Sequence, residues 1–141
     1  MIAFLDTSVL VATFYGEHEH HDSSIGLFVR LDKKSGATAA HCLAEVYSVL
    51  TGMPGKDRVS PDEALLFLGD VRERLTLTTL SAAEYTDAIT DAAARGLVGG
   101  GIYDALVSRC ALKSRANALY TWNVQHFMRH GPGVAAMVRR P

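Results

Sequence analysis

The stretch IAFLDTS (residues 2–8) joins a short apolar run to one acid and two hydroxyl residues. An unbroken apolar run such as residues 2–5 is typical of a strand buried on both faces of a parallel sheet. The next residue, Asp6, would then lie at the carboxyl edge of the sheet, where ligands bind in open α/β folds. Thr7 can begin a helix, so Asp6 is equally well placed as a helix cap, and its position alone leaves both roles open.

The composition is that of an ordinary globular protein. The chain has 141 residues, of which 48% are hydrophobic and 21% are charged, so we expect a single domain over residues 1–141. A net charge of −1 excludes a generally basic nucleic-acid binder but allows a local basic patch. We see neither a membrane-spanning stretch nor a signal peptide. Cys42 and Cys110 lack CxxC spacing and indicate reduced thiols, which predicts a cytoplasmic protein without a membrane partner.

Strand patterns alternate with helical patterns along the chain. Further strands are predicted at residues 36–40, 75–80, 117–123 and 133–138, and helices at residues 23–33, 42–51, 60–74, 81–95 and 102–113. Ser60 and Ser81 each begin a capping-box pattern, with Glu63 and Glu84 three residues later. The alternation predicts the α/β class, as a three-layer α/β/α sandwich with a mostly parallel central sheet of four or five strands.

Three more polar residues fall where the same sheet edge is expected. Glu45 lies at the border of an apolar helix stripe, Asp104 lies in a first helical turn, and Asn123 follows the fourth strand together with Thr121. Alone, each has an ordinary explanation, as a solvated acid, a residue favoured by the helix dipole or a helix cap. Together with Asp6 they would gather on one edge, where carboxylates repel unless a cation compensates. Oxygen ligands without thiolates favour Mg²⁺ or Mn²⁺.

Four segments together resemble the motifs of a known family. FLDTSVLVA, AEVYSVL, GIYDALV and TWNVQHF resemble, in this order, the motifs of the PIN-domain family, and most closely those of VapC-type toxins of bacterial toxin–antitoxin pairs. The resemblance covers nearly the whole chain. It implies a Mg²⁺- or Mn²⁺-dependent endoribonuclease that leaves a 3′-hydroxyl and a 5′-phosphate, forms a homodimer and is inhibited by a VapB-type antitoxin.

The resemblance also implies roles for individual residues. Asp6, Glu45 and Asp104 match the acid positions of the family and would hold the metal, Glu45 directly or through water. The fourth position is often Asp but is Asn123 here, which carries no charge and puts a second metal in question. Hydroxyls that would orient the carboxylates or bound water are those of Thr7, Ser8 and Thr121.

Other functions remain as alternatives. Asn123 keeps open a catalytically silent PIN-like domain that binds RNA or a partner without cutting. A phosphoacceptor receiver domain would need paired acids after the first strand, and a haloacid-dehalogenase-type phosphatase would need Asp at position 8, which is Ser8. The apolar stripes of the helices at residues 60–74 and 81–95 predict that this pair contributes to an antitoxin groove or a dimer face.

The remaining conspicuous residues favour structural roles. The tract GEHEHHDSS (residues 16–24) is interpreted as a solvated loop and helix start, because no further ligands complete a zinc site around it. His41, Cys42 and Cys110 are interpreted as core packing near the site, and Phe127 likewise. His126 is placed near the substrate, whereas Arg95, Lys113 and Arg115 are interpreted as surface cations that favour solubility.

Overall fold

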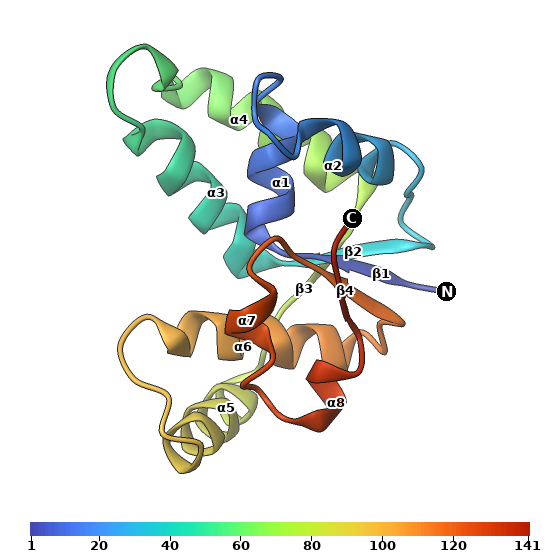
Figure 1. Cartoon of the computed structure of the whole chain (residues 1–141), viewed down its shortest axis with the longest axis vertical. Coiled ribbons are helices and arrows are strands. Elements are labelled where there is room, and N and C mark those ends of the chain that lie inside the picture. Colours follow the sequence, from blue (N-terminus) through green and yellow to red (C-terminus); the bar gives the residue numbers. More distant parts are fainter.

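The computed structural model describes residues 1–141 (Figure 1). Its strands are β1 (Ala3–Leu5), β2 (Gly36–Ala39), β3 (Thr76–Thr78), β4 (Ala118–Tyr120) and β5 (Val138–Arg139). Its helices are α1 (Thr7–Phe14), α2 (His21–Phe28), α3 (Ala40–Gly52), α4 (Pro61–Arg74), α5 (Ala82–Ala94), α6 (Gly101–Lys113), α7 (Val124–Phe127) and α8 (Pro132–Ala135), with a 3-10 turn at Gly55–Asp57. None of these helices combines the length and the apolar character needed to cross a membrane.

The five strands form one parallel sheet. Their order is β3-β2-β1-β4-β5, which places β1 at the centre. Phe4 and Leu5 are fully buried, as expected for a strand covered on both faces. The strand order reverses between β1 and β4, and the carboxyl ends of these two strands therefore border the crevice in which such sheets bind ligands. Asp6 follows β1 at this point, and Thr121 follows β4.

Two layers of helices cover the sheet. Helix α1 packs on α2 and α3, and α3 packs on α4, whereas α6 contacts α5, α7 and α8. In Figure 1 the first group lies above the sheet and the second below it. The buried core joins residues of both layers to the strands, for example Leu10 of α1, Val107 of α6 and Leu119 of β4. The predicted three-layer sandwich with a parallel sheet is confirmed.

Two predicted elements have different bounds. Residues 133–138 were expected to be a strand, but α8 covers Pro132–Ala135 and the fifth strand begins at Val138. Pro132 fits the first position of a helix, and Gly131 before it has φ 99°, which suits glycine. The helix predicted at residues 23–33 is α2, which ends at Phe28. A turn follows because Asp32 Oδ1 accepts from the backbone N–H groups of Lys34 and Ser35.

The two expected capping boxes also differ. Ser81 forms a complete box, in which its hydroxyl accepts from Glu84 N–H and Glu84 accepts from Ser81 N–H. At α4 the Ser60 hydroxyl accepts from Glu63 N–H, but the Glu63 carboxylate accepts from the Ser60 hydroxyl instead of the backbone. The second box is therefore only half formed.

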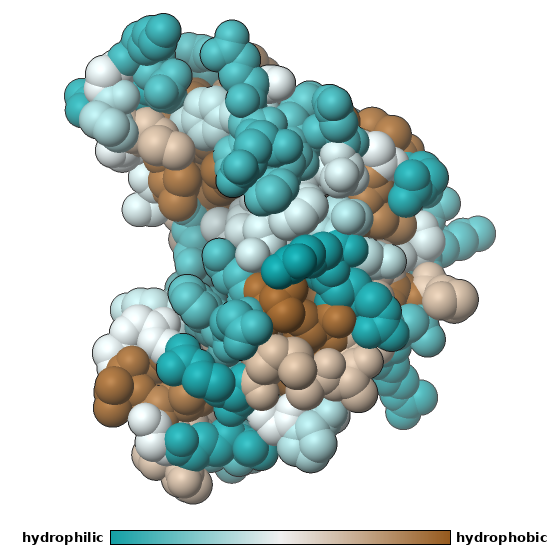
Figure 2. Space-filling view, viewed as in Figure 1, coloured by the Kyte–Doolittle hydropathy of each residue, from teal (hydrophilic) through white to brown (hydrophobic).

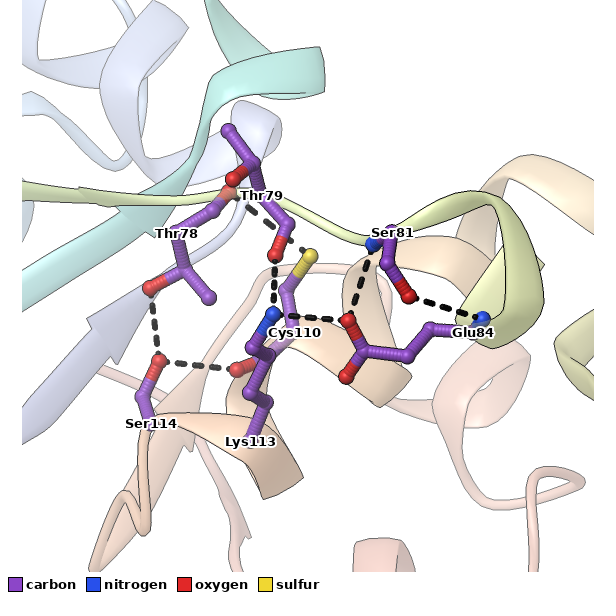
Figure 3. A network of polar contacts seen from close by, with 7 residues as sticks. All are labelled: Thr78, Thr79, Ser81, Glu84, Cys110, Lys113 and Ser114. Carbon is purple, nitrogen blue, oxygen red and sulfur yellow. Dashed lines mark hydrogen bonds and ion pairs between the residues drawn. The ribbon is translucent and has the colours of Figure 1, made fainter.

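A polar network joins the start of α5 to the end of α6 (Figure 3). Lys113 Nζ donates to Thr79 O at 2.8 Å and pairs with Glu84 Oε1 at 2.7 Å. The Lys113 side chain and the Ser81 backbone N–H lower the pKa of Glu84 to about 2. Lys113, interpreted from the sequence as a surface cation for solubility, thus ties these two helices together. The hydroxyls of Thr78 and Ser114 meet at 2.7 Å beside it.

Candidate functional site

Asp6 serves as the helix cap that its position allowed and also faces the crevice. It is the N-cap of α1, where its side chain accepts from Ser8 N–H, and it is only 4% exposed. Asp6 Oδ2 accepts from the Ser8 hydroxyl at 2.9 Å and from the Thr121 hydroxyl at 2.8 Å. Burial raises the pKa of Asp6, and these hydrogen bonds oppose that rise. The carboxylate is therefore held in one orientation by Ser8 and Thr121, which are 113 positions apart in the sequence.

Glu45 reaches the crevice from the second turn of α3. Its pKa is raised from 4.5 to about 7, first by burial and then by the negative charges of Asp6 and Asp104. His41 lies one turn earlier, with Nε2 3.4 Å from Glu45 Oε1. This contact brings the two groups together without the geometry of a hydrogen bond, since His41 Nε2 has no hydrogen-bond partner.

Asp104 lies in the first turn of α6 and is half-buried. Burial raises its pKa, and the charge of Asp6 raises it further, whereas His126 and Arg129 lower it. His126 Nδ1 is 3.6 Å from Asp104 Oδ2, so the residue predicted to lie near the substrate contacts one of the acids. The negative charge of Asp6 raises the pKa of both Glu45 and Asp104, so these three carboxylates lie within electrostatic range of one another.

Asn123 lies beside the acids at the exposed start of α7. Its side chain makes no capping hydrogen bond, which removes the ordinary explanation for this residue. Its backbone N–H donates to Thr121 Oγ1 at 2.9 Å, and the same hydroxyl donates to Asp6. Thr121 is fully buried, so it fixes both Asp6 and the entry into the loop that carries Asn123.

An open cleft of about 500 Å³ brings these residues together. Its lining includes all four predicted site residues, Asp6, Glu45, Asp104 and Asn123, together with the hydroxyl residues Thr7 and Ser8. Figure 2 shows a hollow between the lobe of α3 and α4 and the lobe of α5 and α6, with hydrophilic residues along it. The residues that the sequence predicted for the site thus lie together at the carboxyl edge of the sheet. We call this cleft the acid cleft.

The donor set of the acid cleft suits a hydrated hard cation. No three of the His, Cys, Asp and Glu side chains meet at the spacing needed to hold an ion directly. Thr7 Oγ1 is buried without a hydrogen-bond partner, although it lies close enough to Glu45 to lower the pKa of that carboxyl. Carboxylates with an unpartnered hydroxyl fit Mg²⁺, which keeps several of its waters and needs few direct ligands.

The histidine tract contributes more than the sequence suggested. It is a loop followed by the start of α2, as predicted, but His18, Glu19 and His20 also line the acid cleft. The His20 ring stacks on Trp122 with centroids 3.7 Å apart and an interplanar angle of 7°. Trp122 is anchored because its Nε1 donates to Ser24 Oγ at 2.8 Å. Trp122 was not predicted as a site residue from the sequence. Its position next to Asn123 is the feature of the sequence that could have identified it.

A second stacked pair lies beside Glu45 and Asp104. The rings of His41 and Tyr103 are 5.3 Å apart at 12°, and Tyr103 is 51% exposed. His41 is thus half-buried at the rim instead of packed in the core, contrary to the prediction. Cys42, Cys110 and Phe127 are buried in the core as predicted.

Comparisons with known proteins identify the family and the fold. The PIN domain family profile matches residues 3–126. The chain is 36% identical to Ribonuclease VapC40 of Mycobacterium tuberculosis over 81% of each chain, and 32% identical to Ribonuclease VapC27 of the same organism over 79% of this chain and 78% of that one.

Two solved structures share the fold. VapC20 of M. tuberculosis, described as a Sarcin-Ricin loop cleaving toxin, has a TM-score of 0.71 at 15% identity and covers 88% of this chain and 92% of its own. VapBC2 from Rickettsia felis has a TM-score of 0.68 at 21% identity and covers 100% and 99%.

Proposed function

The chain belongs to the PIN-domain family, as a VapC-type toxin, and we propose that it is an endoribonuclease whose acid cleft holds Mg²⁺ or Mn²⁺. The names of VapC40 and VapC27 support ribonuclease activity. The observation that supports the metal is the shared cleft, in which burial, followed by the charges of Asp6 and Asp104, raises the pKa of Glu45. Three acids that repel one another favour a bound cation.

Each residue of the acid cleft has a proposed part in RNA hydrolysis. Asp6, Glu45 and Asp104 hold the cation, with waters between the ion and at least one of them. When bound, the cation polarises the scissile phosphoryl group and lowers the pKa of the attacking water. Thr121 keeps Asp6 in place, and Asn123 orients bound water as a neutral ligand or hydrogen-bonding group. By family resemblance, the products carry a 3′-hydroxyl and a 5′-phosphate.

Asp6→Asn separates the metal role of Asp6 from its role as a cap. Asn is about as good a cap as Asp, and its neutral side chain relieves repulsion among the acids, so in chelator the variant should unfold at a temperature equal to or above that of the parent. Its RNA cleavage with added Mg²⁺ or Mn²⁺ should fall by roughly a hundredfold or more, because a charged ligand is lost. The readouts are thermal unfolding and cleavage of labelled RNA. A variant that folds and cuts like the parent would contradict the metal assignment.

Chelation separates the nuclease from a PIN-like domain that binds without cutting. EDTA should abolish cleavage, and excess Mg²⁺ should restore it. If RNA binds but stays intact with either metal, the silent alternative holds instead. Sequencing of RNA ends in the same samples gives the cleavage site and the end chemistry.

The likeness to VapBC2 supports a VapB-type antitoxin as partner. The two helices predicted to form one surface differ in position, since α4 packs on α3 and α5 packs on α6 in opposite lobes. Each still exposes large apolar residues, Leu65 and Leu66 on α4 and Tyr85 and Ile89 on α5. We propose that these helices form two separate surfaces, for the antitoxin and for a homodimer. A monomer by light scattering at micromolar concentration, with no partner recovered on co-expression, would overturn this.

A further inference from the structure

A second pocket lies between α5, α6 and α8, and the proposed hydrolysis does not use it. Its volume is about 240 Å³, and its polar lining consists of Asp91, Arg95, Ser108, Arg109 and His130. In Figure 1 these helices meet in the lower half of the molecule. We call this the arginine pocket.

Two buried polar atoms of the arginine pocket lack partners. Ser108 is 3% exposed and His130 is 8% exposed, yet Ser108 Oγ and His130 Nε2 have no hydrogen-bond partner in the protein. Buried polar groups in folded proteins are nearly always paired with protein, water or a ligand. Both residues line the pocket, so a group inside it is the available partner.

The guanidinium of Arg95 is oriented but not saturated. Its Nε donates to Asp91 Oδ2 at 2.9 Å, and its terminal nitrogens make no hydrogen bond within the protein. It lies against Gly131, where a Cβ would come within 2.8 Å of Nη2. Gly131 has φ 99°, a backbone conformation that favours glycine, whereas the flexible Arg95 side chain could move away from a Cβ. Arg109 also lines the pocket, and it makes neither a side-chain hydrogen bond nor an ion pair within the protein.

The charge balance of the arginine pocket favours an anion. Two guanidinium groups face one carboxylate, Asp91, which is already paired with Arg95. The pKa of His130 is lowered by burial and then by Arg129 and Arg95, so the imidazole is neutral and donates from Nε2 in the tautomer that carries its single proton there. Planar guanidinium groups with free N–H donors bind the oxygens of phosphate in a bidentate manner. Phosphate is the anionic group of RNA.

The arginine pocket is adjacent to the acid cleft. Asp104 of the acid cleft and Ser108 of the pocket are four residues apart on α6, a rise of about 6 Å. The charge of Arg129 lowers the pKa of both Asp104 and His130, so this residue is within electrostatic range of both features. Both features therefore border the same helix, α6.

We propose that the arginine pocket binds a phosphate group, through Arg95, Arg109, Ser108 and His130. If the proposed function holds, this is a phosphate of the RNA strand next to the one that is cleaved; the other source of the same chemistry is free phosphate. The pocket thereby fixes the register of the strand in the acid cleft.

Binding assays in the Asp6→Asn background test this without cleavage. The variants are Arg109→Gln and Ser108→Ala, and the control is Arg30→Ala, an exposed arginine beyond the end of α2 that lines neither feature. Calorimetry with inorganic phosphate and fluorescence anisotropy with a short single-stranded RNA are the measurements, and thermal unfolding verifies the fold. We expect roughly tenfold weaker RNA binding for Arg109→Gln, a smaller loss for Ser108→Ala and none for the control.

Salt dependence separates a phosphate contact from a structural effect. Loss of one phosphate contact should reduce the slope of log affinity against log salt by about 0.7 for single-stranded RNA. Weaker binding of both probes supports the RNA source, and weaker binding of inorganic phosphate alone supports free phosphate. Unchanged binding of both probes overturns the arginine pocket, even if the parent cleaves RNA. An inactive parent that still shows Arg109-dependent phosphate binding overturns the nuclease and leaves the pocket intact.

Discussion

Glu45→Gln removes a partly exposed carboxyl of the acid cleft whose pKa is raised. Burial, followed by the charges of Asp6 and Asp104, moves this pKa from 4.5 to about 7. A carboxyl with a raised folded-state pKa binds more protons in the folded protein than in the unfolded chain, so stability falls as pH rises from about 4.5 to 7. The full shift corresponds to roughly 3 kcal/mol. Because the side chain is 34% exposed, solvent screening reduces this to about 1–2 kcal/mol.

We therefore expect Glu45→Gln to be more stable than the parent at pH 8 in chelator by about 1–2 kcal/mol, or roughly 3–6 °C in Tm. At pH 4.5 the two proteins should be equally stable, since the carboxyl is then protonated in the folded state. The assay is thermal and urea unfolding by circular dichroism between pH 4.5 and 8. Glu73→Gln, an exposed glutamate near the end of α4, is the matched control for the loss of one charge.

Added Mn²⁺ should reverse the order at pH 8. A cation that binds only the folded state stabilises it by mass action, and the parent holds the cation more tightly than Glu45→Gln does. The reasoning is refuted if the difference between parent and variant is the same at pH 4.5 and pH 8. It is equally refuted if Glu73→Gln reproduces the effect, because the stabilisation would then come from net charge and not from the acid cleft.

Three further variants test separate parts of the structure. Asn123→Asp adds a charge to the cleft, and calorimetry should report about two- to fivefold tighter divalent binding with a less stable apo protein; unchanged values would remove Asn123 from the site. Glu84→Gln removes a carboxylate whose pKa is lowered to about 2, and the parent should therefore lose stability as pH falls from about 4.5 to 2. The variant should lose less stability over the same pH range, and unfolding measured at stepwise pH tests this. Trp122 is the single tryptophan, so stacked RNA bases should quench its fluorescence, and Trp122→Ala should weaken RNA binding roughly tenfold in the Asp6→Asn background. An RNA affinity unaffected by this last change would exclude base stacking on Trp122.

Local patterns in the sequence determined the elements and the class of the fold. The apolar run before Asp6 predicted a buried parallel strand, and the alternation of strands and helices predicted the layers, because both depend on the periodicity of neighbouring residues. The edge of the sheet followed from the same reasoning, since residues after parallel strands share one side. This is why Asp6, Glu45 and Asn123 could be placed together before any contact was known. Asp104 lies on α6, which follows α5 and not a strand, so the same rule does not place it.

Contacts between distant residues needed the tertiary structure. The hydrogen bond from Thr121 to Asp6 depends on β4 lying next to β1, and no local pattern records strand order. The position of His20 in the acid cleft likewise depends on a distant contact. Its ring stacks on that of Trp122, which is 102 residues later in the sequence.

Burial and strand position were likewise decided by packing. Residues 133–138 looked like a strand by their apolar character, yet a helix that begins at Pro132 covers residues up to Ala135, and His130 just before it lines the pocket beside α6. The arginine pocket exists because three helices from separate parts of the sequence meet there and leave Ser108 without a partner. Sequence periodicity identifies which face of each helix is buried, but the polar atoms left unpaired depend on which faces meet.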